Sequence, residues 1–245
     1  MNEIPKNTTP SRETYIVELC TNTPLGKDEQ GSQKLKRYLE EGAEIFGIPK
    51  IADPATHLSE KYGFSGWLPG ESASAMHAYA WDERKPSFVS VDVVTRPANN
   101  LAQAEKLPKF REHAKDYFQA TDSQIVFKTS RDSSEWRDLA PEIIRQRLTL
   151  RIKLRELLTA EALSEYFDNL CLKLDMLKIS NPLIRAGKQT TNAWMHWETS
   201  GVVLTQDKQN LEGEIDIYTC KSFSPAEARR FTRESLGEVV EAREF

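Results

Sequence analysis

The stretch Val91-Asp92-Val93-Val94-Thr95 returns in the second half of the chain as Ile215-Asp216-Ile217-Tyr218-Thr219. Each copy is followed by a polar break that contains a proline, then by a helix-like segment and a short β-type run. A fixed order of elements that recurs along a chain indicates duplication of one structural unit. The sequence therefore predicts an α+β protein, a tandem duplication of a β-α-β-β-α-β unit. Two such units would pack either sheet against sheet or helix layer against helix layer.

The bulk composition excludes several classes of protein. The chain has 245 residues, of which 39% are hydrophobic and 29% charged, as in an ordinary globular protein. Its net charge of −4 gives no electrostatic reason to expect nucleic acid or an anionic membrane as a partner. No apolar run approaches the roughly 20 residues that span a bilayer. The polar start lacks an export signal, and three cysteines are too few for a disulfide framework, so we expect a cytoplasmic protein.

The pattern of polar and apolar residues divides the chain into four parts. Residues 1–13 are expected to form a flexible tail. The first unit, which holds the candidate active site, is expected over residues 14–130. Residues 131–145 would connect it to the second unit, over residues 146–245.

Within the first unit, Thr14–Thr21 is apolar and β-branched and predicts the first strand. A helix is expected next, with Ser32 as its N-cap and Gly47 at its C-terminal end. β-type segments fill residues 62–96. A second helix is expected over Leu101–Ala120, with Pro108 marking either its true start or a kink.

The second unit repeats this plan. Leu148–Leu154 alternates as a half-buried strand would, and Thr159 is expected to cap the following helix. Two β-type runs are predicted at Asn192–Thr205 and Leu211–Cys220. Ser224 is expected to cap the last helix, with proline at its first position.

The first unit carries one candidate site. Ser65-Gly66 is followed by Glu71-Ser72, by His77, and by a strand ending Asp92-Val93-Val94-Thr95. On chemistry alone, a serine after a glutamate is unremarkable, and His77 could be a strand histidine whose hydrogen bonds are satisfied. The arrangement nevertheless resembles the prokaryotic S-adenosylmethionine decarboxylases. Their pattern is Ser-Gly, then Glu-Ser, a histidine five residues later, and a strand ending Asp-x-x-Thr-Cys. The segment Val17-Glu18-Leu19 also resembles the family's first strand.

This resemblance implies an αββα sandwich and a pyruvoyl-dependent decarboxylase acting on S-adenosylmethionine or a related amino acid. In that family the serine hydroxyl attacks the preceding peptide carbonyl, the resulting ester eliminates, and the chain splits in two. Ser72 would become the pyruvoyl cofactor and Glu71 the new carboxyl end. His77 would act as the acid or base of this cleavage and Ser65 as a hydrogen-bonding group. The pyruvoyl ketone forms an imine with the substrate amine and takes up the electrons left by decarboxylation.

The resemblance also implies substrate binding by Glu18, Trp67 and Arg96. Arg96 is itself a departure from the family, because it stands where the family's proton-donating cysteine is expected. An arginine keeps its proton at any working pH, so it could hold a carboxylate instead. The alternative is that Arg96 turns outward at the end of its strand. Ala73 is a second departure, since the family usually has histidine there.

The second unit shows the reverse pattern. Cys220 is present at the expected place, but no Glu-Ser precedes it at the family's spacing. Glu198-Thr199 lies near that position, yet Ser200-Gly201 matches the earlier Ser-Gly pair equally well, which leaves two registers open. The bacterial enzymes pair two identical subunits, so this chain would fold as its own pseudo-dimer.

Two other functions remain open at this point. The chain could be an unprocessed pseudoenzyme, kept as a binding or dimerisation module, or a lyase that uses S-adenosylmethionine without a pyruvoyl group. We expect a small-molecule substrate and no binding to nucleic acid or membranes. A homo-oligomer or a protein partner from the polyamine pathway is left open. His57 and His113 are isolated, so no metal site is predicted.

One further cluster has two interpretations. Trp194-Met195-His196-Trp197 is either sheet-face packing or a stacking wall for an adenine or a sulfonium. Cys171, on an apolar helix face, is expected in the core.

Overall fold

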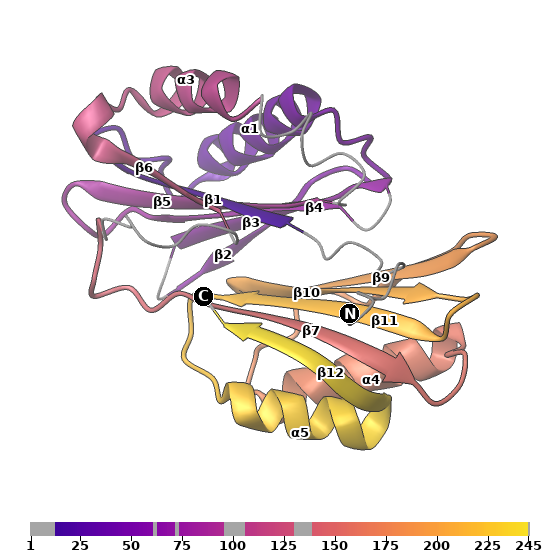
Figure 1. Ribbon diagram of the computed structural model, residues 1–245. Coiled ribbons are helices and arrows are strands. Elements are labelled where there is room, and N and C mark those ends of the chain that lie inside the picture. Colours follow the sequence, from indigo (N-terminus) through magenta and orange to yellow (C-terminus); the bar gives the residue numbers. More distant parts are fainter. Residues whose placement is uncertain (1–12, 61–62, 72–73, 96–105, 130–138, 245) are drawn as a thin grey trace, which may run out of the picture.

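The computed structural model describes residues 13–60, 63–71, 74–95, 106–129 and 139–244. These residues form an α+β fold with two antiparallel six-stranded sheets and four α-helices. The sheets face each other, and the helices cover the two outer faces (Figure 1). The layers therefore follow the order helices, sheet, sheet, helices, so that the sheets pack against each other and the alternative of facing helix layers is wrong.

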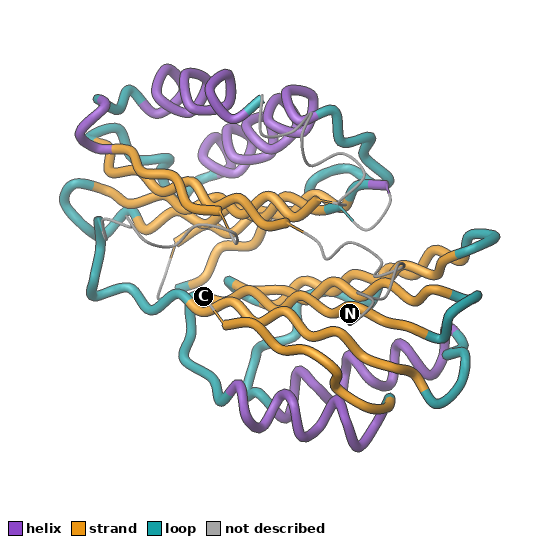
Figure 2. Tube along the Cα trace, in the orientation of Figure 1, coloured by secondary structure: helices purple, strands orange, loops and turns teal. Residues whose placement is uncertain are grey.

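The first sheet has the strand order β2-β3-β4-β5-β1-β6, with α1 and α3 on its outer face (Figure 2). Its elements are β1 (Glu13–Thr21), α1 (Glu29–Phe46), β2 (Ala55–Ser59), β3 (Gly63–Pro69), β4 (Ala75–Trp81), β5 (Ser87–Thr95), α3 (Leu107–Phe118) and β6 (Ile125–Thr129). We refer to them together as the first unit.

The second sheet, read from its other edge, has the order β8-β9-β10-β11-β7-β12. Its elements are β7 (Gln146–Leu154), α4 (Ala160–Lys173), β8 (Leu183–Ala186), β9 (Thr190–Trp197), β10 (Ser200–Asp207), β11 (Glu212–Thr219), α5 (Pro225–Ser235) and β12 (Gly237–Glu244). They form the second unit. Matched in chain order, the twelve strands take the same places in the two sheets, β1 corresponding to β7 and β6 to β12.

The helix ends follow the capping signals of the sequence with one exception. Thr159 and Ser224 accept the expected backbone N–H bonds at the starts of α4 and α5, and Pro108 lies in the first turn of α3. Gly47 ends α1 in the left-handed conformation, with φ of 66°, as predicted. The N-cap of α1 is Asp28 and not Ser32, because Ser32 is buried inside the first turn, where its hydroxyl lies 2.7 Å from that of Thr56.

The strand predictions were wrong at one place. The run Asn192–Thr205 is two strands, β9 and β10, joined by a tight turn at Glu198-Thr199. Both strands are buried on both faces, so apolar residues continue up to Trp197 and resume at Val202. The polar and small residues between them, Glu198–Gly201, are the signal of the turn. The short strands β2 and β8 were not predicted.

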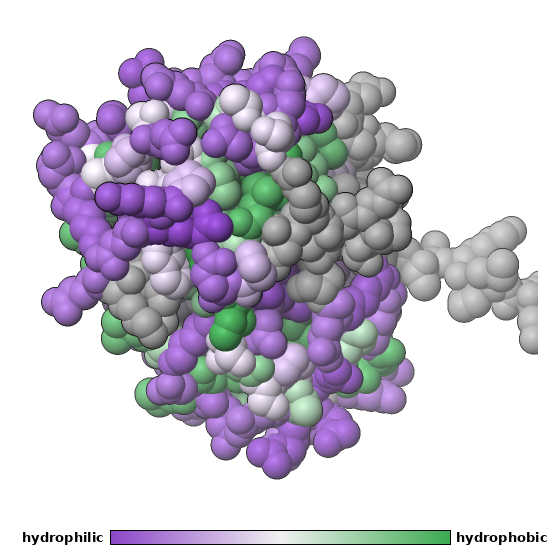
Figure 3. Space-filling model, turned by 90° about the vertical axis from the view of Figure 1, so that its left-hand side faces the viewer, coloured by the Kyte–Doolittle hydropathy of each residue, from purple (hydrophilic) through white to green (hydrophobic). Residues whose placement is uncertain are grey.

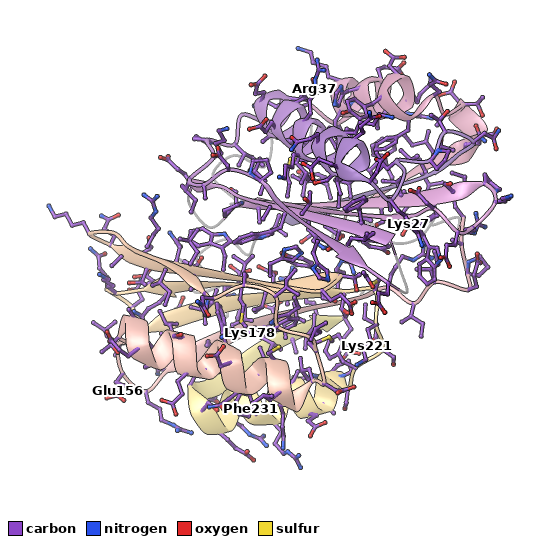
Figure 4. The ribbon with its side chains drawn as sticks, turned by 180° about the vertical axis from the view of Figure 1, so that it is seen from behind. Lys27, Arg37, Glu156, Lys178, Lys221 and Phe231 are labelled. Atoms are coloured by element: carbon purple, nitrogen blue, oxygen red, sulfur yellow. The ribbon has the colours of Figure 1, made fainter. Side chains whose placement is uncertain are left out.

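Apolar side chains fill three layers. One core lies between the first sheet and its helices, and a second between the other sheet and α4 and α5. Cys171 lies in the second of these, as expected. Figure 4 shows Arg37 and Phe231 on the outermost helical layers, on opposite sides of the sheets. Between the sheets lie aromatic residues mixed with buried polar and charged groups, which is where the candidate site is found.

The face seen in Figure 3 is mostly hydrophilic where it is coloured, with small apolar areas between the hydrophilic side chains. Among the described residues, no helix is long and apolar enough to cross a membrane.

Candidate functional site

A buried ion pair joins the two units at the centre of the interface. Asp92 on β5 is fully buried, and Arg147 on β7 is 4% exposed. The guanidinium donates from Nε to Oδ1 of Asp92 at 2.8 Å and from Nη2 to Oδ2 at 2.6 Å. Burial alone would raise the pKa of Asp92, but the Arg147 charge and the nearby His77 outweigh burial and hold it below its usual value. Asp92 is therefore a carboxylate at neutral pH.

His77 lies next to this pair on β4, directly opposite Asp92 in the strand register. Its Nδ1 is 3.6 Å from Oδ2 of Asp92, and the ring is buried. Burial lowers the pKa of His77 below its usual value; Asp92 opposes this shift and Arg147 adds to it. A neutral imidazole at pH 7 can accept a proton, which is the property that a general base needs.

Three further rings surround His77 from both sheets. The ring of Tyr218 on β11 lies 4.8 Å from it and that of His196 on β9 lies 5.6 Å away. His196 stacks on Trp67 of β3 at 5.7 Å. The Nε2 atoms of His77 and His196 are buried and have no hydrogen-bond partner among the described residues. Since buried polar atoms are normally paired, this cluster is the place in the interface where polar groups are left available.

Glu71 occupies the connection between β3 and β4. Its backbone N–H donates to the carbonyl of Pro49 at 2.8 Å, and its own carbonyl accepts the N–H of Ser74 at 3.1 Å. Ser72, Ala73 and Arg96 lie outside the described residues. The backbone on both sides of Ser72 is thus fixed by hydrogen bonds.

Ser65 is not brought next to Glu71. Its side chain is buried, and its hydroxyl donates to the carbonyl of Glu198 in the turn between β9 and β10. Ser65 precedes Pro69, the last residue of β3, by four residues, which is about 13 Å of extended strand. The contact ties the first unit to a turn of the second.

Glu18 and Trp67 are both buried in the interface. Glu18 on β1 accepts a hydrogen bond from Nη1 of Arg145 at 2.6 Å, so its charge is balanced within the chain. Trp67 is 6% exposed and packs against Trp194, Tyr218 and neighbouring apolar side chains. Substrate binding by Glu18 and Trp67 stays a prediction.

The aromatic run of the second unit is divided between two layers. Trp194 belongs to the cluster between the sheets, while Met195 and Trp197 belong to the core beneath α4. The indole of Trp194 donates to the carbonyl of Ser74 at 3.1 Å, and thereby holds the start of β4. Three of the four side chains therefore pack in apolar clusters, while His196 lies beside His77.

The second unit does not repeat the histidine. Asp216 occupies the register position of Asp92, but Val203 stands opposite it where the first unit has His77. Asp216 accepts a hydrogen bond from the Thr149 hydroxyl at 2.8 Å. In a strand-by-strand match, the Glu198-Thr199 turn corresponds to the connection that contains Glu71, and Ser200-Gly201 begins β10 as Ser74-Ala75 begins β4.

Cys220 follows β11 and is buried at 4% exposure. Burial raises the pKa of its thiol to about 11. The thiol therefore stays protonated at neutral pH. It belongs to the second unit, in which Val203 stands at the position that corresponds to His77.

A surface cleft of about 760 Å³ opens beside the turn of the second unit. Residues of both units line it: His57, Leu58, Glu60, Asp175, Met176, Leu177, Trp197, Glu198, Thr199, Ser200 and Lys221. Figure 4 shows Lys221 at the margin of the second sheet. The cleft lies at the end of β3 that carries Ser65, away from Glu71. No group of three or more metal-ligating side chains occurs in the described residues.

Sequence reasoning missed Arg147. It begins an alternating strand and has no local signal, because its partner Asp92 lies 55 residues earlier in the chain. His196 and Tyr218 were noticed only as members of repeated or aromatic runs. Their proximity to His77 depends on how the sheets face each other.

The fold and site define a four-layer α+β protein with a buried acid–base cluster shared between two sheets. No family model matches the chain, and no curated protein matches it. A solved structure of adenosylmethionine decarboxylase from Aquifex aeolicus is 15% identical with a TM-score of 0.35, over 52% of this chain and 98% of that one. A candidate monooxygenase of Fusobacterium nucleatum is 8% identical with a TM-score of 0.31, over 97% of this chain and 91% of that one.

A candidate monooxygenase of Lactobacillus acidophilus is 10% identical with a TM-score of 0.26, over 96% of this chain and 92% of that one. At TM-scores this low, none of these similarities assigns a function to the chain.

Proposed function

We propose that the chain is a pyruvoyl-dependent decarboxylase that acts on S-adenosylmethionine or a related amino acid. Two like units, derived by duplication, would form a pseudo-dimer in which only the first unit is active. The matching strand orders of the two sheets support duplication. In the first unit His77 lies opposite Asp92, whereas in the second unit the corresponding Asp216 has Val203 opposite it. This difference supports a single active site, in the first unit.

The observation that carries the proposal is the hydrogen bond from the Ser74 N–H to the Glu71 carbonyl. This carbonyl is the group that the Ser72 hydroxyl would attack. A backbone N–H on its oxygen stabilises the negative charge that develops there as the attack proceeds. The same bond joins Glu71 to Ser74, the described residues on the two sides of positions 72 and 73.

The proposed maturation needs only water as a co-reactant. Ser72 Oγ attacks the Glu71 carbonyl carbon, and the Glu71–Ser72 C–N bond breaks to give an ester and a free amine. Loss of the Ser72 Cα proton then breaks the Cβ–O bond and releases the Glu71 carboxylate. This elimination leaves a dehydroalanine at position 72. Water hydrolyses it, its nitrogen leaves as ammonia, and a pyruvoyl group then begins the second fragment.

The residues of the interface fit such a group. His77, five residues after Ser72, is neutral and has an Nε2 without a partner among the described residues, so it can take and return the protons of maturation. A pyruvoyl ketone supplies the electron sink that no side chain provides for decarboxylation. Asp92 and Arg147 lie beside the ring that would move those protons, with Oδ2 of Asp92 3.6 Å from Nδ1.

The test is the intact mass of the purified protein. Self-cleavage predicts two fragments, residues 1–71 and residues 72–245, with the second lacking a free amine at its start. Ser72→Ala is the matched control and should remain a single chain of about 28.0 kDa. A wild-type protein that stays intact, with an ordinary serine at position 72, would sink the pyruvoyl mechanism.

The second candidate is an unprocessed relative of the same fold. It would be either a pseudoenzyme that binds S-adenosylmethionine or a polyamine-pathway partner, or a lyase that uses no pyruvoyl group. The large cleft beside Glu198, remote from Glu71, favours this candidate. An intact chain that binds S-adenosylmethionine without turnover identifies the pseudoenzyme, and turnover without release of carbon dioxide identifies the lyase.

A further inference from the structure

The carboxylate of Asp92 is shared unequally between two groups. Arg147 of the second unit takes both of its oxygens, at 2.8 and 2.6 Å. His77 of the first unit stays 3.6 Å from Oδ2, beyond a normal hydrogen bond. A bidentate guanidinium is the stronger partner, so Asp92 is the counter-ion of Arg147 and not of His77.

The other titratable groups that face His77 are uncharged. They are Tyr79 on its own strand, His196 on β9 and Tyr218 on β11. Burial raises the pKa of Tyr79 and Tyr218 and lowers that of His196, so all three are neutral near pH 7. Because Arg147 balances Asp92, an imidazolium at His77 would have no uncompensated anion beside it.

We propose that Arg147 is a positioning residue for the proposed self-cleavage, which keeps His77 in its free-base form. Arg147 fixes Asp92 beside the imidazole, with Oδ2 3.6 Å from Nδ1, and at the same time cancels the charge that would draw a proton to the ring. The inference rests on the proposed function, and it makes the site of the first unit incomplete without the second unit.

The proposed tautomer follows from the same geometry. A proton on Nδ1 faces the Asp92 carboxylate, which leaves the lone pair on Nε2. Nε2 would take the proton of the Ser72 hydroxyl as Oγ attacks. It would return that proton to the Ser72 nitrogen as the C–N bond breaks, so that His77 ends unchanged.

The experiment follows the titration of His77 by NMR of labelled histidines in the Ser72→Ala background, where no cleavage can occur. Removing the guanidinium with Arg147→Gln leaves Asp92 free to pair with His77. The His77 midpoint should then rise by about one pH unit or more, which is a tenfold gain in proton affinity. Arg147→Lys, a single point charge that cannot span both oxygens, should give a smaller rise.

Arg145→Gln is the matched control. Arg145 is another arginine of the interface, but it pairs with Glu18. Its loss should leave the His77 midpoint in place. An unchanged midpoint in folded Arg147→Gln, or an equal shift in Arg145→Gln, would overturn the inference. If Arg147→Gln does not fold, an Arg147→Lys midpoint equal to wild type overturns it.

A second measurement separates this inference from the proposed function. In chains that keep Ser72, Arg147→Gln should move the acid limb of the cleavage rate to higher pH, by the same amount as the His77 midpoint. A wild-type chain that does not cleave at any pH removes the proposed function, whereas the titration still decides whether Arg147 controls the protonation of His77.

Discussion

The two buried histidines of the interface make the stability of the fold sensitive to mild acid. His77 and His196 are each 1% exposed, and burial holds the pKa of both below the usual 6.5, that of His196 well below. In the unfolded chain both rings bind a proton once the pH falls below about 6.5. The unfolded state then binds more protons than the folded state, so the free energy of unfolding falls as the pH falls.

The magnitude follows from linkage. For a ring that stays neutral in the fold, lowering the pH from about 7.5 to about 5.5 costs about 1.4 kcal/mol. His196→Gln removes one such ring. The loss of unfolding free energy over this range should therefore be about 1.4 kcal/mol smaller in His196→Gln than in the parent chain.

Urea denaturation of chains carrying Ser72→Ala at each pH provides the assay. Gln209→Asn serves as the control, because Gln209 is exposed and carries no titratable group, and it should keep the parent pH dependence. The reasoning is refuted if His196→Gln and the parent lose the same free energy between the two pH values.

Three other outcomes are expected from the structure. Arg147→Met leaves the buried Asp92 carboxylate unpaired, so it should reduce the free energy of unfolding at pH 7 by about 3–5 kcal/mol in urea denaturation. Adding Asp92→Asn should recover part of that loss. A reduction below about 1 kcal/mol contradicts this expectation. Gly47→Ala should cost about 1 kcal/mol in thermal denaturation, because φ of 66° is unfavourable for a residue with a Cβ, and an unchanged midpoint would speak against the capping role. Burial raises the pKa of the Cys171 and Cys220 thiols to about 11. Both thiols should therefore resist iodoacetamide at about pH 8 in the folded protein and react after unfolding. Rapid labelling of the native chain would contradict this by showing that the thiols are accessible.

Local signals were sufficient for most of the helices and strands. Gly47, Thr159 and Ser224 mark helix ends because capping depends on a few neighbouring backbone groups. The alternation over Leu148–Leu154 predicted β7 for a similar reason, since one face of a strand packs on the helices. The turn at Glu198-Thr199 was missed although Glu198–Gly201 interrupts the apolar pattern with polar residues and a glycine.

Some residues of the candidate site could likewise be recognised from the sequence, and others could not. Glu71 and His77 were singled out by the resemblance to a family motif, which could be recognised because it lies within one stretch of sequence. Arg147 could not be recognised in this way, because it reaches Asp92 only when the two sheets face each other. Ser65 was grouped with Glu71 by the same resemblance, yet its hydroxyl donates to the carbonyl of Glu198 in the turn of the second unit.

The sequence by itself determined the α+β class, the repeated order of elements and most of the helix caps, because these depend on periodicity and on contacts within a few residues. Tertiary structure alone decided that the sheets face each other and that Asp92 pairs with Arg147. It also decided that His77 meets His196 and Tyr218. Those contacts join strands from two units, and the free energy of burying their polar groups depends on both partners being present.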